Sequence, residues 1–356
     1  LMWKMLSAKG AVGTVAPVDF HLSMESGVTT NAQAGSPQDS TGTPVVSPMG
    51  HLEVGTRFTV PTRTFIRPAL GVEARLNGFT AQSVKKYSSI DIAYLPGILF
   101  GRTTTLLLSY RGSLMMLAWP GKTLFRETHR AELELTHPNG QLFFANAGKR
   151  IYKENGRTRW ELEAGYGRSK TLNGWTALLL SVNGRYYNAI GAPYDEIGAG
   201  LLAAAQFSLP RRFALKSGIG ESADYFFNSG GPKGMDAFGI NTRRRDWTIR
   251  HFDELWFPPL KKIKLGVRYE FNHRDSNANA SNSNISYDYL EHRILLKISI
   301  GITANPLVPD VRNESSHVPL NYGLHTTDDN PGINSREIAE MMRMDEAARA
   351  ASSCVE

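Results

Sequence analysis

Apolar and polar side chains alternate with a period of two through most of this chain, from about residue 18 to residue 302. Successive side chains of a β-strand point to opposite faces, so this alternation predicts strands with two chemically different faces. The clearest example is segment 287–302. One of its faces carries Leu290, Ile294, Leu296, Ile298, Ile300 and Ile302, and the other carries Glu291, Arg293, Lys297 and Ser299.

Fourteen segments follow the same rule, and many of them are longer than the five or six residues of an ordinary strand. The predicted segments are 18–27, 52–60, 66–77, 87–95, 105–118, 128–136, 143–152, 159–168, 175–187, 196–209, 213–225, 247–257, 263–274 and 287–302. Strands of this length and number predict an all-β fold, a transmembrane antiparallel up-and-down β-barrel of about 14 strands. The alternative is another all-β fold, such as a sandwich, a propeller or a β-helix.

The connections between these segments alternate in length. Short ones, such as 137–140 and 171–174, contain the turn sequences Pro-Asn-Gly and Leu-Asn-Gly, whereas long ones, such as 30–49, are rich in Gly, Asn, Ser and Pro. Outer-membrane barrels have short periplasmic turns and longer extracellular loops. We therefore expect a bacterial outer-membrane protein with both termini periplasmic: a lead-in at 1–17, the barrel at 18–302, and an extension at 303–356.

The second face of the segments is too charged for a dry core, since burying unpaired charges is costly. A hydrated lumen can hold them, and aromatic residues such as Trp175, Tyr186 and Trp247 lie near the ends of the apolar face, as in a membrane barrel. The predicted lumen-lining residues are Arg57, Arg67, Glu73, Arg75, Arg111, Arg130, Glu132, Arg185, Arg268, Glu270, Arg293 and Lys297. They could tune pore selectivity, or simply pair across strands and fill the barrel.

The alternation stops after residue 302. Segment 336–351 is rich in helix-forming residues and follows Asn334 and Ser335, which favour a helix start. We expect residues 303–356 to dock a periplasmic or outer-membrane protein partner; a plug inside the lumen and a disordered tail are the alternatives. The candidate partner-binding residues are Ile338, Met341, Met342 and Met344.

No recognised catalytic motif is present in the sequence: GxSxG, HExxH, a P-loop and CxxC are all missing. The nine His are dispersed, the single Cys354 stands near the end, and the net charge of +7 is scattered. We therefore expect no enzyme activity, no cofactor, no metal site and no nucleic-acid partner. Two histidines, His129 and His292, are predicted to face outward, where an interfacial anchor is the simplest role.

Two parts of the barrel resemble a known family. Residues 25–32 (ESGVTTNA) resemble the opening strand of barrels that follow tetratricopeptide-repeat domains, although Val-Thr-Thr replaces the usual Tyr-Asp-Ser. The segments 269–277 (YEFNHRDSN) and 287–293 (YDYLEHR) resemble the final hairpin of the same proteins, which include surface lipoprotein assembly modifiers and exopolysaccharide-export barrels. This resemblance implies a role in the export or assembly of surface molecules.

The expected function is therefore an integral outer-membrane barrel for export or assembly, or a membrane anchor for a complex that spans the periplasm. The alternative is a passive diffusion porin with a weakly anion-favouring lumen, which the arginine-rich face and the net charge of +7 favour. In either case, outer-membrane lipid and lipopolysaccharide are expected partners of the apolar face.

Overall fold

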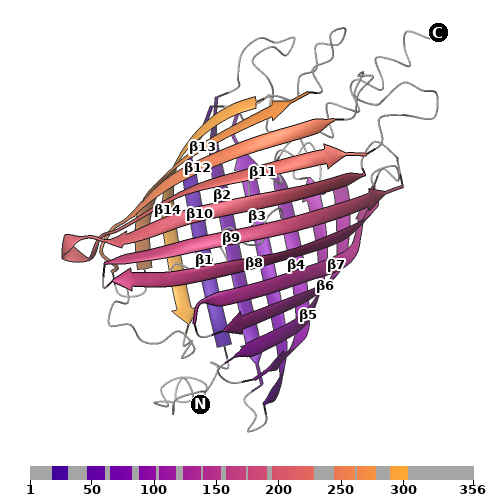
Figure 1. Ribbon diagram of the computed structural model, residues 1–356, viewed down its shortest axis with the longest axis horizontal. Helices are drawn as coiled ribbons and strands as arrows, with labels where there is room; N and C mark the ends of the chain where they lie inside the picture. The colour runs from indigo at the N-terminus through magenta and orange to yellow at the C-terminus, as the bar shows by residue number, and fades with distance from the viewer. Residues whose placement is uncertain are drawn as a thin grey trace.

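The chain folds into a closed barrel of fourteen antiparallel strands, each paired with its neighbours in sequence, as Figure 1 shows. The computed structural model describes residues 18–30, 46–60, 65–81, 88–101, 104–117, 123–137, 139–140, 141–153, 158–173, 175–190, 195–227, 244–260, 263–277 and 289–303. The strands are β1 (Val18–Thr29), β2 (Ser47–Thr59), β3 (Ile66–Phe79), β4 (Ser89–Phe100), β5 (Thr105–Leu117), β6 (Thr123–His137), β7 (Gln141–Tyr152), β8 (Arg159–Asn173), β9 (Thr176–Ala189), β10 (Glu196–Ser208), β11 (Ala214–Phe226), β12 (Arg245–Trp256), β13 (Ile263–Ser276) and β14 (Tyr289–Thr303).

The predicted fold class and the number of strands are therefore confirmed. β1 closes the barrel by pairing with β14, with Phe20 opposite Ile302 and Thr29 opposite Arg293. Closure leaves no free strand edge, so every strand pairs with a neighbour on both sides. Within the described ranges, no helix is long and apolar enough to cross a membrane.

Several predicted strand ends were wrong. β2 begins at Ser47 rather than residue 52, and β6 begins at Thr123 rather than 128. β4 continues through Pro96 to Phe100, whereas the predicted strand ended at residue 95. The pairing of β4 with β5 is interrupted at this point, between Tyr94 and Gly97, so the missing N–H of the proline falls where the ladder is already irregular.

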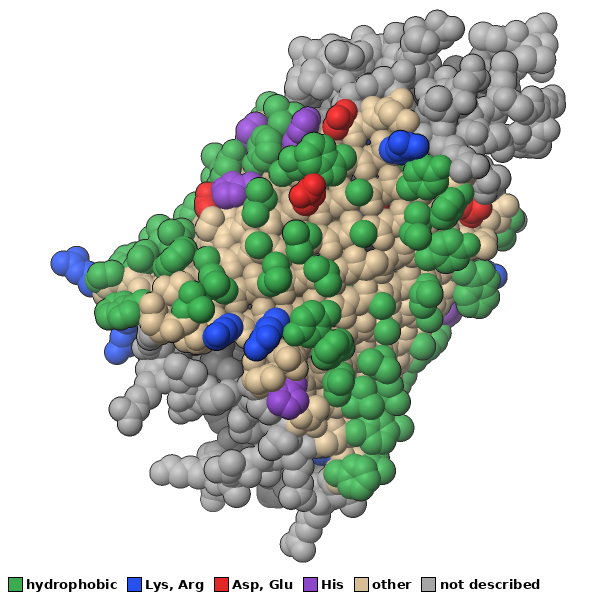
Figure 2. Space-filling view, viewed as in Figure 1, with side chains coloured by type: hydrophobic (Ala, Val, Ile, Leu, Met, Phe, Trp, Pro, Cys, Tyr) green, Lys and Arg blue, Asp and Glu red, His purple; other side chains and the backbone are tan. Residues whose placement is uncertain are grey.

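The two faces of the barrel differ as the alternation predicted. Exposed large apolar side chains cover the outer surface, among them Leu162 and Ile294, which are 54% and 62% exposed. Figure 2 shows such side chains spread over the visible face. On β14, the neighbours of Ile294 in sequence, Arg293 and Leu295, point inward and are buried.

The two ends of the barrel also differ. The connections at one end are 60–65, 101–104, 138–140, 174–175, 209–213 and 257–262. Those at the opposite end include the longest ones, 30–46, 80–88, 227–244 and 277–288, together with the shorter 118–122, 153–158 and 190–195. β1 begins and β14 ends at the end with the shorter connections, because Asp19 lies opposite Thr303. We call this the turn end and the opposite one the loop end.

Candidate functional site

The inner wall of the barrel carries the chemistry of this chain. Every predicted lumen-lining residue lies at an inward-facing position of its strand. Each is separated by an even number of positions from buried residues of the same strand, and therefore lies on the same face as they do. Half of these side chains are buried, and most lie in ion pairs along the wall.

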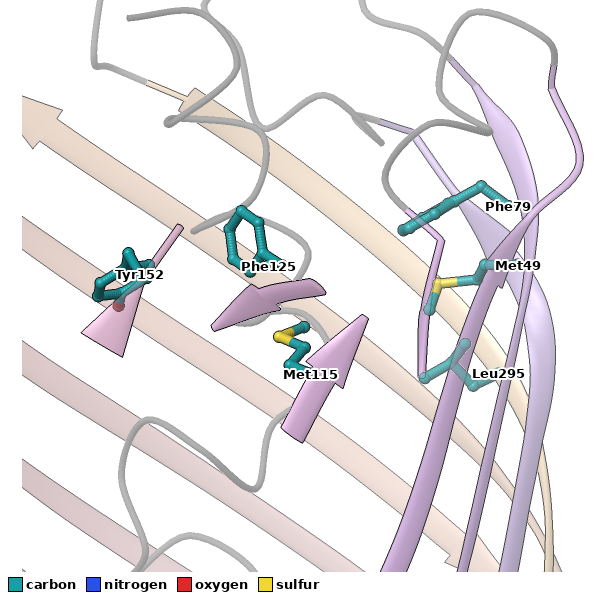
Figure 3. Packing of buried hydrophobic residues seen from close by; sticks show 6 residues of the cluster. All are labelled: Met49, Phe79, Met115, Phe125, Tyr152 and Leu295. Carbon is teal, nitrogen blue, oxygen red and sulfur yellow. The ribbon is translucent and has the colours of Figure 1, made fainter. Parts of the chain in front are cut away.

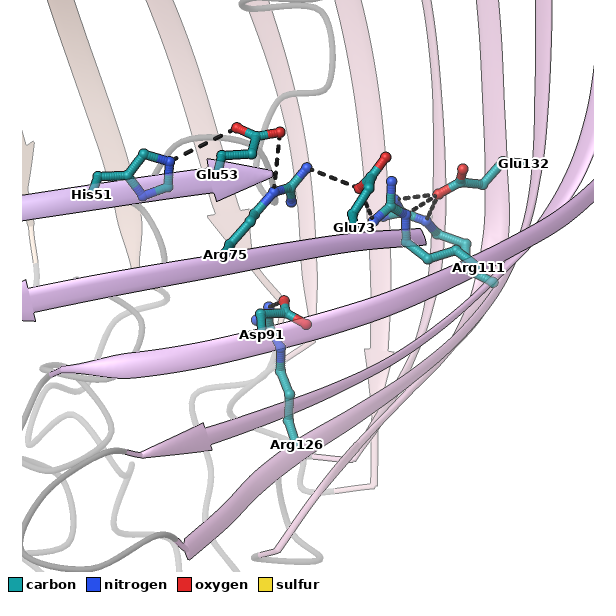
Figure 4. A network of polar contacts seen from close by, with 9 residues as sticks. His51, Glu53, Glu73, Arg75, Asp91, Arg111, Arg126 and Glu132 are labelled. Atoms are coloured by element: carbon teal, nitrogen blue, oxygen red, sulfur yellow. Dashed lines mark hydrogen bonds and ion pairs between the residues drawn. The ribbon is translucent and has the colours of Figure 1, made fainter. Parts of the chain in front are cut away.

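The first ion network crosses β2, β3, β5 and β6 (Figure 4). Its members are His51, Glu53, Glu73, Arg75, Arg111, Arg130 and Glu132. Arg111 is its centre: Nη1 lies 2.9 Å from Oε2 of Glu73 and Nε lies 2.8 Å from Oε1 of Glu132. The contact to Glu73 passes over β4, where Ala93 stands opposite Glu73 and its small side chain leaves room.

The remaining members extend this network at both ends. Arg75 lies 3.3 Å from Glu73 and 3.6 Å from Glu53, measured from Nη2 and Nε to the nearer carboxylate oxygens. On the far side, Nη2 of Arg130 lies 2.6 Å from Oε1 of Glu132. Each arginine of the network therefore lies within 3.6 Å of a carboxylate, and Arg111 and Arg130, which stand opposite each other on β5 and β6, share Glu132.

The second group of pairs, the seam network, surrounds the junction of β1 and β14. Its members are Glu25, Glu254, Arg268, Glu270, Glu291, Arg293 and Lys297. Nζ of Lys297 lies 3.0 Å from Oε1 of Glu25 and 2.7 Å from Oε1 of Glu254. Thr29 donates a 2.8 Å hydrogen bond to Glu291, so polar side chains join β1 to β14 at two levels.

Lys297 reaches Glu254 across an intervening strand. Gly266 of β13 stands opposite Lys297 and, on its other side, opposite Trp256 of β12. A Cβ atom at Gly266 would lie 2.9 Å from the Trp256 ring. The Trp256 ring fills the space that a side chain at Gly266 would take, and Nζ of Lys297 lies 5.5 Å from the centroid of that ring.

Arg185 forms a third bridge of the same kind. Its Nε lies 3.0 Å from Oε1 of Glu196 on β10, and its Nη2 pairs with Asp224 on β11. Gly198 stands between them, opposite Arg185 on one side and Asp224 on the other. Because Gly198 has no side chain, Arg185 on β9 can pair with Asp224 on β11 across β10.

Two other predicted residues lie outside these groups. Arg67 is buried and donates to the backbone carbonyl of Gly101, so it anchors a connection at the turn end. Arg57 faces inward on β2, opposite Asp19 and Gly71. The predicted partner-binding residues, Ile338, Met341, Met342 and Met344, lie outside the described residues.

Several charged residues of the wall were not predicted as candidates. They are Glu254 and Asp224, which complete the bridges described above, and Arg126 and Arg150, which pair with Asp91 (3.6 Å) and Glu161 (2.9 Å). The alternation along each strand does place these residues on the inner face. The alternation in β12 is weak, however, because the polar side chains of His251 and Asp253 interrupt its outward apolar face. Those two side chains pair with each other on the outer face, 2.9 Å apart.

The outer-face histidines predicted from the sequence lie beside tyrosines. Nδ1 of His129 is 2.5 Å from the Tyr110 hydroxyl, and Nδ1 of His292 is 2.9 Å from the Tyr269 hydroxyl. Among the residues that the structure describes, no group of three or more His, Cys, Asp or Glu side chains could hold a metal ion.

The fold and its inner wall define the chain as a closed fourteen-stranded antiparallel barrel with a charged interior.

No family model matches the sequence, and no curated protein matches it. Solved structures with a similar fold include the anion-selective porin from Comamonas acidovorans, at 9% identity, with 80% of this chain and 98% of that chain covered and a TM-score of 0.43. A bacterial polysaccharide outer membrane secretin shares 10% identity over 80% of this chain and 97% of its own, with a TM-score of 0.42. OccAB4 of Acinetobacter baumannii shares 7% identity over 81% and 99%, with a TM-score of 0.41. None of these values relates the chain to one of those proteins in particular.

Proposed function

We propose that this chain is an integral barrel of the bacterial outer membrane whose lumen carries polar molecules across the membrane. The observation that carries the proposal is the two-sided wall. Large apolar side chains are exposed outside, and paired charges lie inside a closed barrel. Lipid covers an outward apolar band of this kind, and water fills a polar interior. Lipid and lipopolysaccharide are accordingly the proposed partners of the outer face.

A substitution on the outer face tests the membrane setting directly. Val182 points outward from the middle of β9, opposite Tyr166 and Leu201, and is 46% exposed. Val182→Arg is expected to lower the free energy of unfolding in phospholipid vesicles by about 2–4 kcal/mol, because a charge at the bilayer midplane loses its hydration.

Leu178→Arg provides the matched control, since Leu178 faces outward from the same strand and is 42% exposed, but stands opposite Lys170 near the turn end. Near the interface the cost falls to about 0–1 kcal/mol. Equal effects of the two substitutions, or a stabilising effect of Val182→Arg, would contradict a membrane location of this face.

Planar-bilayer recording with potassium chloride separates the two transport roles. A diffusion porin gives a large, steady current, whereas an export or assembly barrel stays closed without its cargo or partners. The tight pairing and burial of the inner charges support the second behaviour, since such charges lie away from solvent. A large, steady current through the wild-type protein would exclude the closed export barrel and favour the porin.

Residues 303–356 are proposed to bind a periplasmic or outer-membrane protein through Ile338, Met341, Met342 and Met344. The test compares proteins that co-purify with the full chain and with a chain that ends at residue 303. Loss of a specific partner on truncation, with heat-modifiable gel migration retained, supports the proposal. Identical partner sets would contradict it.

A further inference from the structure

An apolar cluster interrupts the charged inner wall at the loop end. We call it the apolar arc; its members are Met49, Phe79, Met115, Phe125, Tyr152 and Leu295, with Ala81 and Leu117 packed against it. All six are at most 7% exposed, and Met115 is fully buried. Figure 3 shows their side chains on the inside of the barrel wall. The arc thus covers part of the inner circumference with side chains that offer water little or no hydrogen bonding.

The position of Phe125 depends on a break in strand pairing. Met115 of β5 stands opposite Arg126 of β6, but Met116 stands opposite Leu124, so Phe125 is an extra residue in β6. Such a β-bulge re-aims a side chain and is common at barrel rims. Here Phe125 and Arg126 are both buried, and the outward face resumes at Leu124, which is 41% exposed.

The Phe125 ring, which the bulge turns inward, packs against the ring of Tyr152. Phe125 and Tyr152 make an edge-to-face contact with their ring centroids 5.9 Å apart. On the other side of the arc, Gly27 of β1 lies between Met49 and Leu295 and contributes no side chain. A Cβ atom at Gly27 would lie 1.8 Å from the carbonyl oxygen of Ile294, so only glycine fits there.

Charged side chains border the arc. Arg126 follows Phe125 directly and pairs with Asp91, and Arg150, two residues before Tyr152, pairs with Glu161. The inner wall therefore changes from paired, buried charges to apolar side chains within a few residues. In narrow channels, apolar constrictions of this kind stop small ions because water leaves them.

We propose that the apolar arc is a hydrophobic constriction of the passage, with the bulged Phe125 and Met115 as its selectivity-determining residues. The inference rests on the proposed transport function. The arc excludes small hydrated ions and admits solutes that present an apolar face to it.

The test is the conductance of potassium chloride through single, folded, heat-modifiable barrels in planar bilayers. Phe125→Ser and Met115→Ser are expected to raise the conductance several-fold, because hydroxyl groups keep water in the constriction. Phe125→Leu retains an apolar side chain and is expected to leave the conductance near the wild-type value.

Leu142→Ser is the matched control. Leu142 is 6% exposed and belongs, with Phe144, to a separate apolar cluster of the inner face near the turn end. Its replacement removes a similarly buried apolar side chain and is expected to leave the conductance unchanged.

The outcomes separate the two proposals. If wild type, Phe125→Ser and Met115→Ser conduct equally, or if Leu142→Ser raises conductance as much, the constriction is overturned while the passage stands. If the folded wild-type protein and all variants are silent, the apolar arc is not what closes the passage, and the constriction is overturned while the closed export barrel stands.

Discussion

Replacing Lys297 by Met is expected to lower the free energy of unfolding by about 3–5 kcal/mol, the usual cost of removing one partner of a buried ion pair. The Lys297 side chain is 3% exposed and holds two carboxylates, those of Glu25 and Glu254, which are 6% and 2% exposed. Without the ammonium group, the buried carboxylates of Glu25 on β1 and Glu254 on β12 would lose the cation that they share. Urea titration of the refolded protein in phospholipid vesicles, followed by heat-modifiable gel migration, measures the loss.

Lys170→Met is the control for that substitution. Lys170 is exposed and faces outward near the turn end of β8, and surface substitutions of this type usually change stability by about 0.5 kcal/mol or less. The charge removed from the chain is the same in both variants. A similar midpoint for Lys297→Met and wild type would show that the seam network adds no stability.

Introducing Val at Gly198 is expected to reduce stability by at least about 3 kcal/mol. A Cβ atom at this position would lie 2.1 Å from Oδ1 of Asp224 and 2.7 Å from Nε of Arg185. The new side chain must therefore separate the pair that crosses β10, and overpacking adds a further cost of about 1–3 kcal/mol. The same urea titration measures this loss.

Gly184→Val on the adjacent strand separates this effect from the general cost of replacing a strand glycine. Gly184 faces outward, and the nearest atom to a Cβ there is 3.9 Å away. A β-branched apolar side chain suits a strand and a lipid-facing position, so little or no loss is expected. If both valines destabilise equally, the two-strand ion bridge is not the reason that position 198 is glycine.

The strand count could be predicted because period-two alternation survives in each strand, even where it is weak. β12 illustrates the limit: His251 and Asp253 interrupt its apolar face, yet Trp247 and Phe257 still mark the outward side. Strand ends were less predictable. Pro96 signals a turn by its chemistry, but the pairing of β4 with β3 continues past it.

The candidate site was predictable as a face but not as a set of contacts. The positions of Arg111 and Glu132 in the alternation of their strands placed both on the inner wall, where they form an ion pair of the first network. No local pattern indicates that Lys297 pairs with Glu254, because that contact depends on the register of three strands and on Gly266 between them. Phe125 is an extra residue in β6, so the alternation of inner and outer side chains is out of step on its two sides. Counting every second residue along β6 therefore could not place Phe125 on the inner face.

The sequence by itself determined that this chain forms strands, how many there are, and which face of each is apolar, because these properties depend on the direction of successive side chains along one strand. Only the tertiary structure decided which charges meet, where the barrel closes and where the inner wall becomes apolar. Those properties depend on register between strands. A single bulge at Phe125 or a missing side chain at Gly198 changes which side chains face each other without changing the alternation that defines the strands.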